Sequence, residues 1–488
     1  MISIPNFSYF CVLQMTFSSI TFLVYFLPVF FLIYHLVPHK FKNGVILLGS
    51  IFFYSWGGPK FIFVILGTTF LDFFLVRKMA EQKTKKSKMG YLIFSVILNT
   101  GLLFYFKYCN FFIENVNALL GSEITWVKVA LPIGISFYTF ESLTYVVDVY
   151  RGIHKPLKNF WHYQTYILLF PKLIAGPIVR YHDIADQITN REKNYTAEMK
   201  LSGFLIFCIG LAKKTILANT LGMQADAVFK LAPDQLNTGA AWIGAIAYTF
   251  QIYFDFSGYS DMAIGIGKIM GFKFPENFNN PYISGSITEF WRRWHITLGS
   301  WMKNYLYIPL GGNKVTTVKL YRNLIIVFLL SGLWHGASWN FIIWGSLHGI
   351  SLAVHKVWML LTGKAFGKFN NSRLYNAVAV LVTFHFVCFG WVFFKAATLE
   401  DASNMLFQIT HDFSFSVWGA FFENYKPVLI MIALAFVLHA IPDDYADKLI
   451  GRFKKVPMPV YIALFFVFVI IYGYFKSAEP VMPIYLQF

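Results

Sequence analysis

Long apolar stretches recur along the chain from Phe17 to Tyr474, and only brief polar segments interrupt them. A helix that crosses a bilayer needs about 20 consecutive apolar residues, whereas a water-soluble core does not require so many runs of this kind. Of the 488 residues, 57% are hydrophobic and 13% are charged, and soluble domains usually carry about 25% charged residues. The sequence therefore predicts one all-α, multi-pass membrane domain.

The apolar runs predict about eleven spans. Several runs are too short for a straight crossing, so some are expected to be re-entrant or buried within the helical bundle. The runs cover residues 17–37, 45–56, 61–75, 91–108, 127–149, 163–175, 201–211, 240–270, 324–354, 374–394, 428–441 and 460–474.

The formal net charge of +17 is spread over short basic clusters between the apolar runs. This pattern is typical of membrane orientation signals, and we expect no nucleic-acid partner. The basic loop 77–88 is predicted to be cytoplasmic, which places the N-terminus outside. The basic cluster 452–455 before the last run places the C-terminus outside as well. The expected location is the inner, or cytoplasmic, cell membrane.

Several kinds of catalytic or metal site have no counterpart in the sequence. The cysteines Cys11, Cys109, Cys208 and Cys388 form no close pair of the kind that a disulfide framework or a zinc site uses. The G-x-S-x-G, H-E-x-x-H and P-loop motifs do not occur. We therefore expect no metal site and no serine hydrolase, zinc protease or nucleotide-driven pump.

The polar interval 273–322 interrupts the apolar pattern but is rich in Trp, Tyr, Arg and Gly. Its aromatic residues have the amphipathic rings that are favoured at headgroup depth. The interval is therefore predicted to be ordered and to lie along one membrane surface. Its tryptophans and tyrosines include Trp291, Trp294, Trp301, Tyr305 and Tyr307.

His335 lies in an apolar run, where an ionisable side chain usually faces the bundle interior or a water-filled path. Imidazole suits acyl transfer because it can take a proton from a hydroxyl near neutral pH and return it to a leaving group. His335 is thus a candidate general base. On this residue alone, a core histidine bonded to a backbone carbonyl is an equally good interpretation. Gly332, Gly336 and Ala337 beside it fit either substrate access or close helix packing.

His295 is the second candidate, because its imidazole could orient an acyl carbonyl or stabilise negative charge. The neighbouring Arg292 and Arg293 are candidate substrate-binding residues for a phosphate-bearing or acidic group, or else anchors of an interfacial helix. Trp334 and Asp255 are further substrate-binding candidates.

Four acids lie in or near apolar sequence, and each is expected to have a partner. A structural ion pair or a helix-end position is the safer interpretation for all of them. They are Glu141, Asp148, Asp255 and Asp261.

Many motifs in a fixed order resemble the membrane-bound O-acyltransferases, and within them the branch typified by alginate O-acetyltransferase membrane subunits. The resemblance covers nearly the whole chain. Its motifs are FSSITFLVYFLP, FPKLIAGPIVRY, YFDFSGYSDMAIG, GFKFPENFNNPY, FWRRWHITLGSW, YLYIPLGGN, GLWHGASWNFIIWG and FGWVFFKA.

This resemblance implies a helical bundle that encloses an acyl-transfer tunnel, with the catalytic histidine at His335 and the second characteristic histidine at His295. It also implies acetyl transfer from a cytoplasmic donor, such as acetyl-CoA or another acetyl thioester, for O-acetylation of an exported or cell-wall polysaccharide, as in alginate biosynthesis. No bound cofactor is implied. Family members usually begin at a position that matches Met15, so residues 1–14 are interpreted as an extension from an upstream start and residues 15–488 as the membrane domain.

Other functions remain open at this point. D-alanyl transfer to teichoic acid is the nearest rival, because its transfer protein resembles the chain around both histidines. A non-enzymatic transporter is a third possibility, although the chain shows no two-fold hydropathy repeat. Outside the apolar runs no segment is large enough for a separate carbohydrate-binding domain. We therefore expect an extracytoplasmic partner protein that passes the acetyl group on to the polymer.

Overall fold

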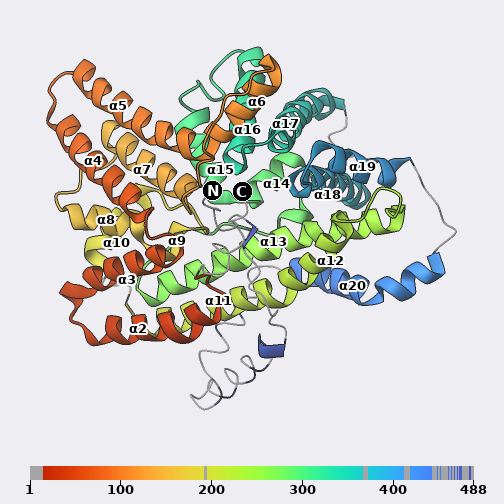
Figure 1. Ribbon diagram of the computed structural model, residues 1–488, viewed down its shortest axis with the longest axis horizontal. Coiled ribbons are helices and arrows are strands. Elements are labelled where there is room, and N and C mark those ends of the chain that lie inside the picture. Colours follow the sequence, from red (N-terminus) through yellow and green to blue (C-terminus); the bar gives the residue numbers. More distant parts are fainter. Residues whose placement is uncertain are drawn as a thin grey trace. The chain divides into compact units, whose positions relative to one another are not determined.

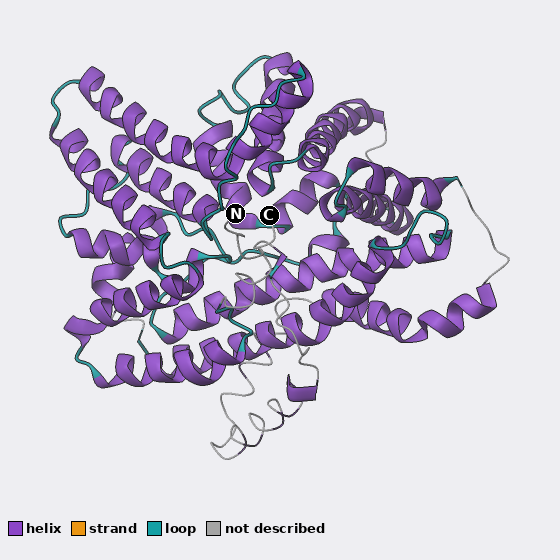
Figure 2. Ribbon diagram, in the orientation of Figure 1, coloured by secondary structure: helices purple, strands orange, loops and turns teal. Residues whose placement is uncertain are grey.

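The computed structural model describes residues 15–191, 195–365, 372–411 and 418–441, together with scattered residues beyond 441. Every regular element longer than one turn is a helix, and no strand occurs among these described residues (Figures 1 and 2). The predicted all-α fold is confirmed. The basic cluster 452–455 and most of the predicted last span, 460–474, lie outside the described residues.

The chain divides into two compact units. Unit 1 comprises Met1–Leu211, Tyr259–Pro275 and Ala478–Phe488, and unit 2 comprises Ala212–Gly258 and Glu276–Ser477. Helix α13 (Thr238–Ile269) contributes residues to both. Both candidate histidines belong to unit 2.

Unit 1 begins with a π-helical turn, Thr21–Phe26, that continues into α2. Helices α4, α5 and α7 lie side by side in Figure 1. The remaining helices of this unit follow in chain order. Their bounds are α2 (Leu27–Leu36), α3 (Lys42–Gly57), α4 (Ile62–Glu81), α5 (Lys85–Leu103), α6 (Cys109–Leu120), α7 (Ile135–Tyr150), α8 (Phe160–Leu168), α9 (Phe170–Leu173), α10 (Tyr181–Asn190) and α11 (Ala197–Ala212).

Unit 2 contains two short helices before its long ones. They are needed to place the candidate histidines, as described below. The bounds are α12 (Asn219–Phe229), α14 (Ile287–Arg293), α15 (Ile296–Met302), α16 (Thr317–His335), α17 (Trp339–Ala365), α18 (Arg373–Lys395), α19 (Leu399–Thr410) and α20 (Trp418–His439).

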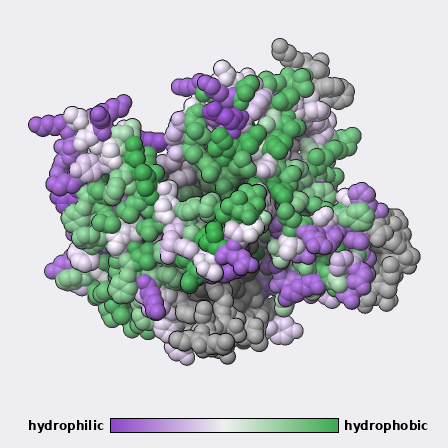
Figure 3. Space-filling model, turned by 45° about the horizontal axis from the view of Figure 1, so that its top comes forward, coloured by the Kyte–Doolittle hydropathy of each residue, from purple (hydrophilic) through white to green (hydrophobic). Residues whose placement is uncertain are grey.

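Four helical segments among the described residues are long and apolar enough to cross a membrane. They are Lys85–Leu120, Ala197–Phe229, Thr317–His335 and Arg373–Lys395, and two shorter apolar helices add to them. Large apolar side chains also point outward, such as Leu36 with 74% of its surface exposed. Figure 3 shows that hydrophobic residues cover much of the described surface on the face in view. Such a surface fits a lipid environment and not water.

Two predicted spans of unit 1 are interrupted. The run 163–175 forms α8 and the short α9, and Gly176 follows in the left-handed region with a φ of 121°. This confirms the predicted break in FPKLIAGPIVRY. The run 127–149 becomes helical only at Ile135, after Gly134 with a φ of 71°.

The predicted run 324–354 is two helices and not one, which corrects the sequence interpretation. Helix α16 ends at His335, and α17 begins at Trp339 after a three-residue turn. The two helices pack closely where two glycines meet: a Cβ atom on Gly332 would lie 3.3 Å from the Cα of Gly345. Gly332 therefore serves close helix packing, one of the two readings left open above.

The interval 273–322 is ordered, as predicted, but its tryptophans are not all at a surface. Trp294 is 1% exposed, and its ring lies 5.6 Å from that of Phe290 and 4.8 Å from that of Trp391. The prediction of headgroup depth is therefore wrong for Trp294. A large aromatic ring gains more by burial against other rings than at an interface.

Candidate active site

His335 is the last residue of α16 and is 4% exposed. The turn to α17 begins directly after it, so its ring lies at a helix end and not in mid-helix. Three aromatic rings surround it at centroid distances of 4.9 to 5.1 Å, those of Trp334, Trp344 and Phe394. The site around His335 is thus a buried aromatic pocket.

His295 lies between α14 and α15 and is 1% exposed. Its φ of 44° and ψ of 54° are left-handed, a conformation that costs energy in a residue other than glycine. The ring of His295 lies 6.0 Å from that of Trp334. Trp334 therefore contacts both candidate histidines, which the sequence separates by 40 positions.

Asn277 holds His295 in this strained position. Its backbone oxygen accepts the N–H of Ile296 at 2.9 Å, which pairs the two strands of chain on either side of α14. The Oδ1 atom of Asn277 lies 3.0 Å from Nδ1 of His295. The same Oδ1 accepts the hydroxyl of Thr297 at 2.9 Å and its backbone N–H at 3.4 Å.

The contacts of Asn277 decide the tautomer of His295. A backbone N–H can only donate, so the Asn277 atom that it faces is the carbonyl oxygen and not the amide nitrogen. Nδ1 of His295 must then donate, which leaves Nε2 of the neutral ring with its lone pair free of a proton. Burial lowers the pKa of His295, a residue outside the candidate spans, and this favours the neutral ring. His295 is therefore arranged to accept a proton or a hydrogen bond through Nε2.

The two candidate arginines differ in their surroundings. The guanidinium of Arg293 pairs with Glu289, with Nε and Oε1 2.9 Å apart, and donates to the backbone and side-chain oxygens of Asn279. It stabilises α14 and the loop that carries Asn277. Arg292 is exposed. Their role in substrate binding stays a prediction.

Asp255 in α13 forms a buried ion pair with Lys214. The expectation that the four acids have partners is confirmed. Glu141 pairs with Lys172, Asp148 accepts from His182, and Asp261 also has an interaction partner. A charge-neutralising role is sufficient for Asp255, and its role in substrate binding stays a prediction.

Comparison with known families now becomes decisive. The sequence model described as "MBOAT, membrane-bound O-acyltransferase family" matches residues 154–398, which include both histidines. The chain belongs to the membrane-bound O-acyltransferase family. It is therefore an acyltransferase and a multi-pass membrane protein.

Three relatives show where the acyltransferase falls within the family. It is 43% identical to the probable alginate O-acetylase AlgI of Pseudomonas aeruginosa, over 83% of this chain and 76% of the relative. It is 39% identical to a peptidoglycan O-acetyltransferase of Helicobacter pylori, over 81% of this chain and 80% of the relative. A teichoic acid D-alanyltransferase of Bacillus subtilis is 29% identical, over 63% of this chain and 81% of the relative. The acyltransferase is thus more similar to O-acetyl-transferring relatives than to the D-alanyl-transferring one.

Sequence reasoning missed two features of the acyltransferase site. Asn277 escaped notice, although it lies in the quoted motif GFKFPENFNNPY. His348 in α17 was also missed: its ring lies 4.9 Å from that of Trp344, which in turn contacts His335. A histidine in an apolar helix was the available signal. We refer to His295, Trp334, His335, Trp344 and His348 as the histidine cluster.

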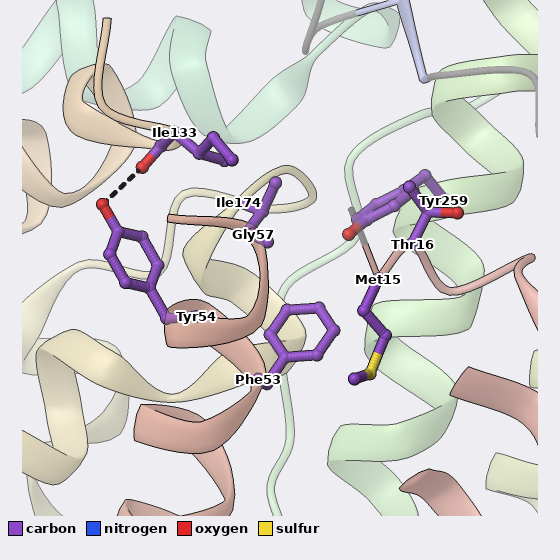
Figure 4. A pocket seen from close by; sticks show the side chains of 8 residues that line it. All are labelled: Met15, Thr16, Phe53, Tyr54, Gly57, Ile133, Ile174 and Tyr259. Atoms are coloured by element: carbon purple, nitrogen blue, oxygen red, sulfur yellow. Dashed lines mark hydrogen bonds between the residues drawn. The ribbon is translucent and has the colours of Figure 1, made fainter. Parts of the chain in front are cut away.

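Unit 1 of the acyltransferase contains a separate pocket, shown in Figure 4. It is largely apolar, and the hydroxyl of Tyr54 beside it donates to the backbone oxygen of Ile133 at 3.0 Å. Neither candidate histidine lines it. The lining residues are Met15, Thr16, Phe53, Tyr54, Gly57, Ile133, Ile174 and Tyr259. Among the described residues, no three His, Cys, Asp or Glu side chains come together as a metal site.

Proposed function

We propose that this acyltransferase moves acetyl groups from a cytoplasmic acetyl thioester, such as acetyl-CoA, for O-acetylation of an exported or cell-wall polysaccharide. The contact of Trp334 with both histidine rings is the observation that carries the proposal. The names of the relatives from Pseudomonas aeruginosa and Helicobacter pylori support acetyl as the group and a polysaccharide or peptidoglycan as the acceptor class. The lower identity to the D-alanyltransferase argues against D-alanyl transfer.

His335 is the proposed general base. The acceptor hydroxyl gives its proton to the imidazole of His335 while its oxygen forms a bond to the acyl carbon. The carbon–sulfur bond of the thioester then breaks, and the departing sulfur takes the proton from the imidazolium. His295, with its unprotonated Nε2, is proposed to accept a hydrogen bond that orients the hydroxyl. Arg292, Trp334 and Asp255 keep their proposed substrate contacts.

The proposal includes a membrane arrangement. About eleven spans in the inner membrane enclose a tunnel that leads from the cytoplasm to the outer surface, and the basic loop 77–88 is cytoplasmic. Cysteine labelling tests this orientation. A cysteine in place of Lys85 should react with an impermeant reagent only after the membrane is opened. Labelling in intact cells would overturn the orientation.

A partner protein with an extracytoplasmic catalytic domain is proposed to take the acetyl group and deliver it to the polymer. A histidine within a helical bundle can act only on hydroxyls that reach it, and a polymer chain is bulky.

Reconstitution tests the function directly. The purified chain is placed in vesicles with acetyl-labelled thioester inside and polysaccharide outside, with and without candidate partners. Label on the polymer only when a partner is present supports the relay. Label without a partner places the whole reaction in this chain, and no transfer with any partner refutes the proposed function.

A further inference from the structure

His348 is a buried histidine to which the proposed mechanism gives no role. Its side chain lies in α17 and has no exposed surface, and the same is true of Trp344. The ring of Trp344 stands between those of His348 and His335, at centroid distances of 4.9 and 5.0 Å. One indole ring thus separates His348 from the proposed general base.

The proton on His348 is located by its neighbour Trp291 in α14. Nε1 of Trp291 lies 3.3 Å from Nδ1 of His348. An indole N–H can only donate, so Nδ1 accepts and the neutral ring carries its proton on Nε2. This Nε2–H has no hydrogen-bond partner among the described residues.

Trp344 offers a second donor of the same kind. Its Nε1–H is buried and also has no hydrogen-bond partner within the described part of the chain. Buried N–H groups in native proteins are nearly always bonded to protein, water or a ligand, because an unbonded one loses its hydrogen bonds to water. Two such donors side by side therefore indicate a bound acceptor.

Both donors lie near Gly390 in α18. A Cβ atom on this residue would lie 3.0 Å from Nε2 of His348. It would lie 3.7 Å from Cδ1 of Trp344, the carbon bonded to Nε1. The glycine therefore keeps the region between the two N–H groups free of a side chain.

The chemistry of the site selects its ligand. Both protein groups donate, so the ligand must offer an oxygen with free lone pairs and need offer no proton. A carbonyl oxygen has this character, and the neighbouring His335 is the proposed site of acyl transfer. We propose that Nε2–H of His348 and Nε1–H of Trp344 bind a carbonyl oxygen of the acetyl donor, either the acetyl carbonyl itself or an amide carbonyl of its carrier arm. This inference rests on the proposed function.

Three variants of the full chain test the donor pair. Trp344→Phe and His348→Phe each remove one N–H and keep an aromatic ring, and Gly390→Ala places a methyl group in front of both donors. Each should raise the KM for the acetyl donor by roughly three- to tenfold, the value of one hydrogen bond. The matched controls are Trp242→Phe, outside the histidine cluster, and Gly67→Ala, where a Cβ would meet no atom within 4 Å. Both controls should leave KM unchanged.

A spectroscopic readout separates binding from a structural role. The probe is an acetonyl thioether analogue of the donor, which keeps the carbonyl but has no carbon–sulfur bond to break at it. It carries ¹³C either at this carbonyl or at an amide carbonyl of the carrier arm, and hydrogen bonding should lower the infrared stretching frequency of the labelled carbonyl that binds. Trp344→Phe and His348→Phe should each return part of this shift. The label that responds identifies which carbonyl is bound.

The outcomes distinguish the two proposals. If wild-type protein transfers acetyl groups but all three variants keep its KM and its carbonyl frequency, the donors bind only water and the inference is overturned. If wild-type protein transfers no acetyl group from any thioester, the proposed function fails instead. A variant with a lowered melting temperature is judged by the carbonyl frequency of its folded fraction.

Discussion

Two buried polar regions of this acyltransferase solve the problem of burial in opposite ways. In unit 1, Lys172 of α9 pairs with Glu141 of α7, and both side chains are at most 1% exposed. The ammonium also lies 4.6 Å from the ring centroid of Tyr166. In unit 2, the histidine cluster relies on neutral rings, and N–H groups of His348 and Trp344 find no bond among the described residues.

The difference indicates which region is structural and which is functional. A buried ion pair satisfies itself, and removing one partner leaves an uncompensated charge. A cluster of neutral rings with unsatisfied donors keeps hydrogen-bonding capacity for a ligand. Substitutions in the first region should therefore affect folding, and those in the second should affect transfer.

The largest effect is expected at the proposed general base. His335→Ala should lower the rate of acetyl transfer by about 10²–10⁴-fold, because the proton of the acceptor hydroxyl loses its acceptor. The measurement is transfer of labelled acetyl by purified protein, with membrane abundance as the control. A near-wild-type rate would remove His335 from the mechanism.

The next effect concerns the ion pair of unit 1. Lys172→Met should destabilise the protein by about 3–5 kcal/mol, because Glu141 is left buried without its partner. The transfer rate per folded molecule should change little. Thermal unfolding in detergent measures the first quantity, and the double variant Lys172→Met/Glu141→Gln should recover much of the stability. A double variant as unstable as the single one would contradict this account.

A smaller effect is expected at Asn277. Asn277→Ala removes the acceptor that fixes the tautomer of His295, and the transfer rate should fall about tenfold, equivalent to about 1.4 kcal/mol. Asn340→Ala is the matched control, because this buried amide bonds only a backbone oxygen in the printed contacts, that of Ala396 at 2.7 Å. Both variants should lower the melting temperature, but only the first should slow transfer. Equal rates in the two variants would show that Asn277 only stabilises the loop.

No effect is expected from the N-terminal extension. We propose Met15 as the functional start, and residues 1–14, which lie outside the described residues, contribute no proposed catalytic group. Deleting them should leave the transfer rate and the membrane abundance unchanged. Loss of transfer by a normally inserted truncated chain would show that the extension has a function.

The sequence by itself determined the solvent and the element type. Apolar runs predicted helices in lipid because hydropathy is a local property of consecutive residues. The same runs did not show that α16 ends at His335, since an apolar pattern continues across the turn. The signals were Gly336 and Ser338, residues typical of a helix end and of a helix start, respectively.

The sequence also identified His335 and His295 as the residues of interest, through motifs in which each histidine is recognised by its immediate neighbours. Only the tertiary structure showed that Trp334 contacts both rings and that Asn277 sets the tautomer of His295. Likewise, only packing brought the donors of α17 to face Gly390 of α18. The physical reason is that a hydrogen bond is decided by the distance and direction between two atoms. When the two atoms belong to different helices, helix packing sets that distance and direction, and the order of residues along the chain does not.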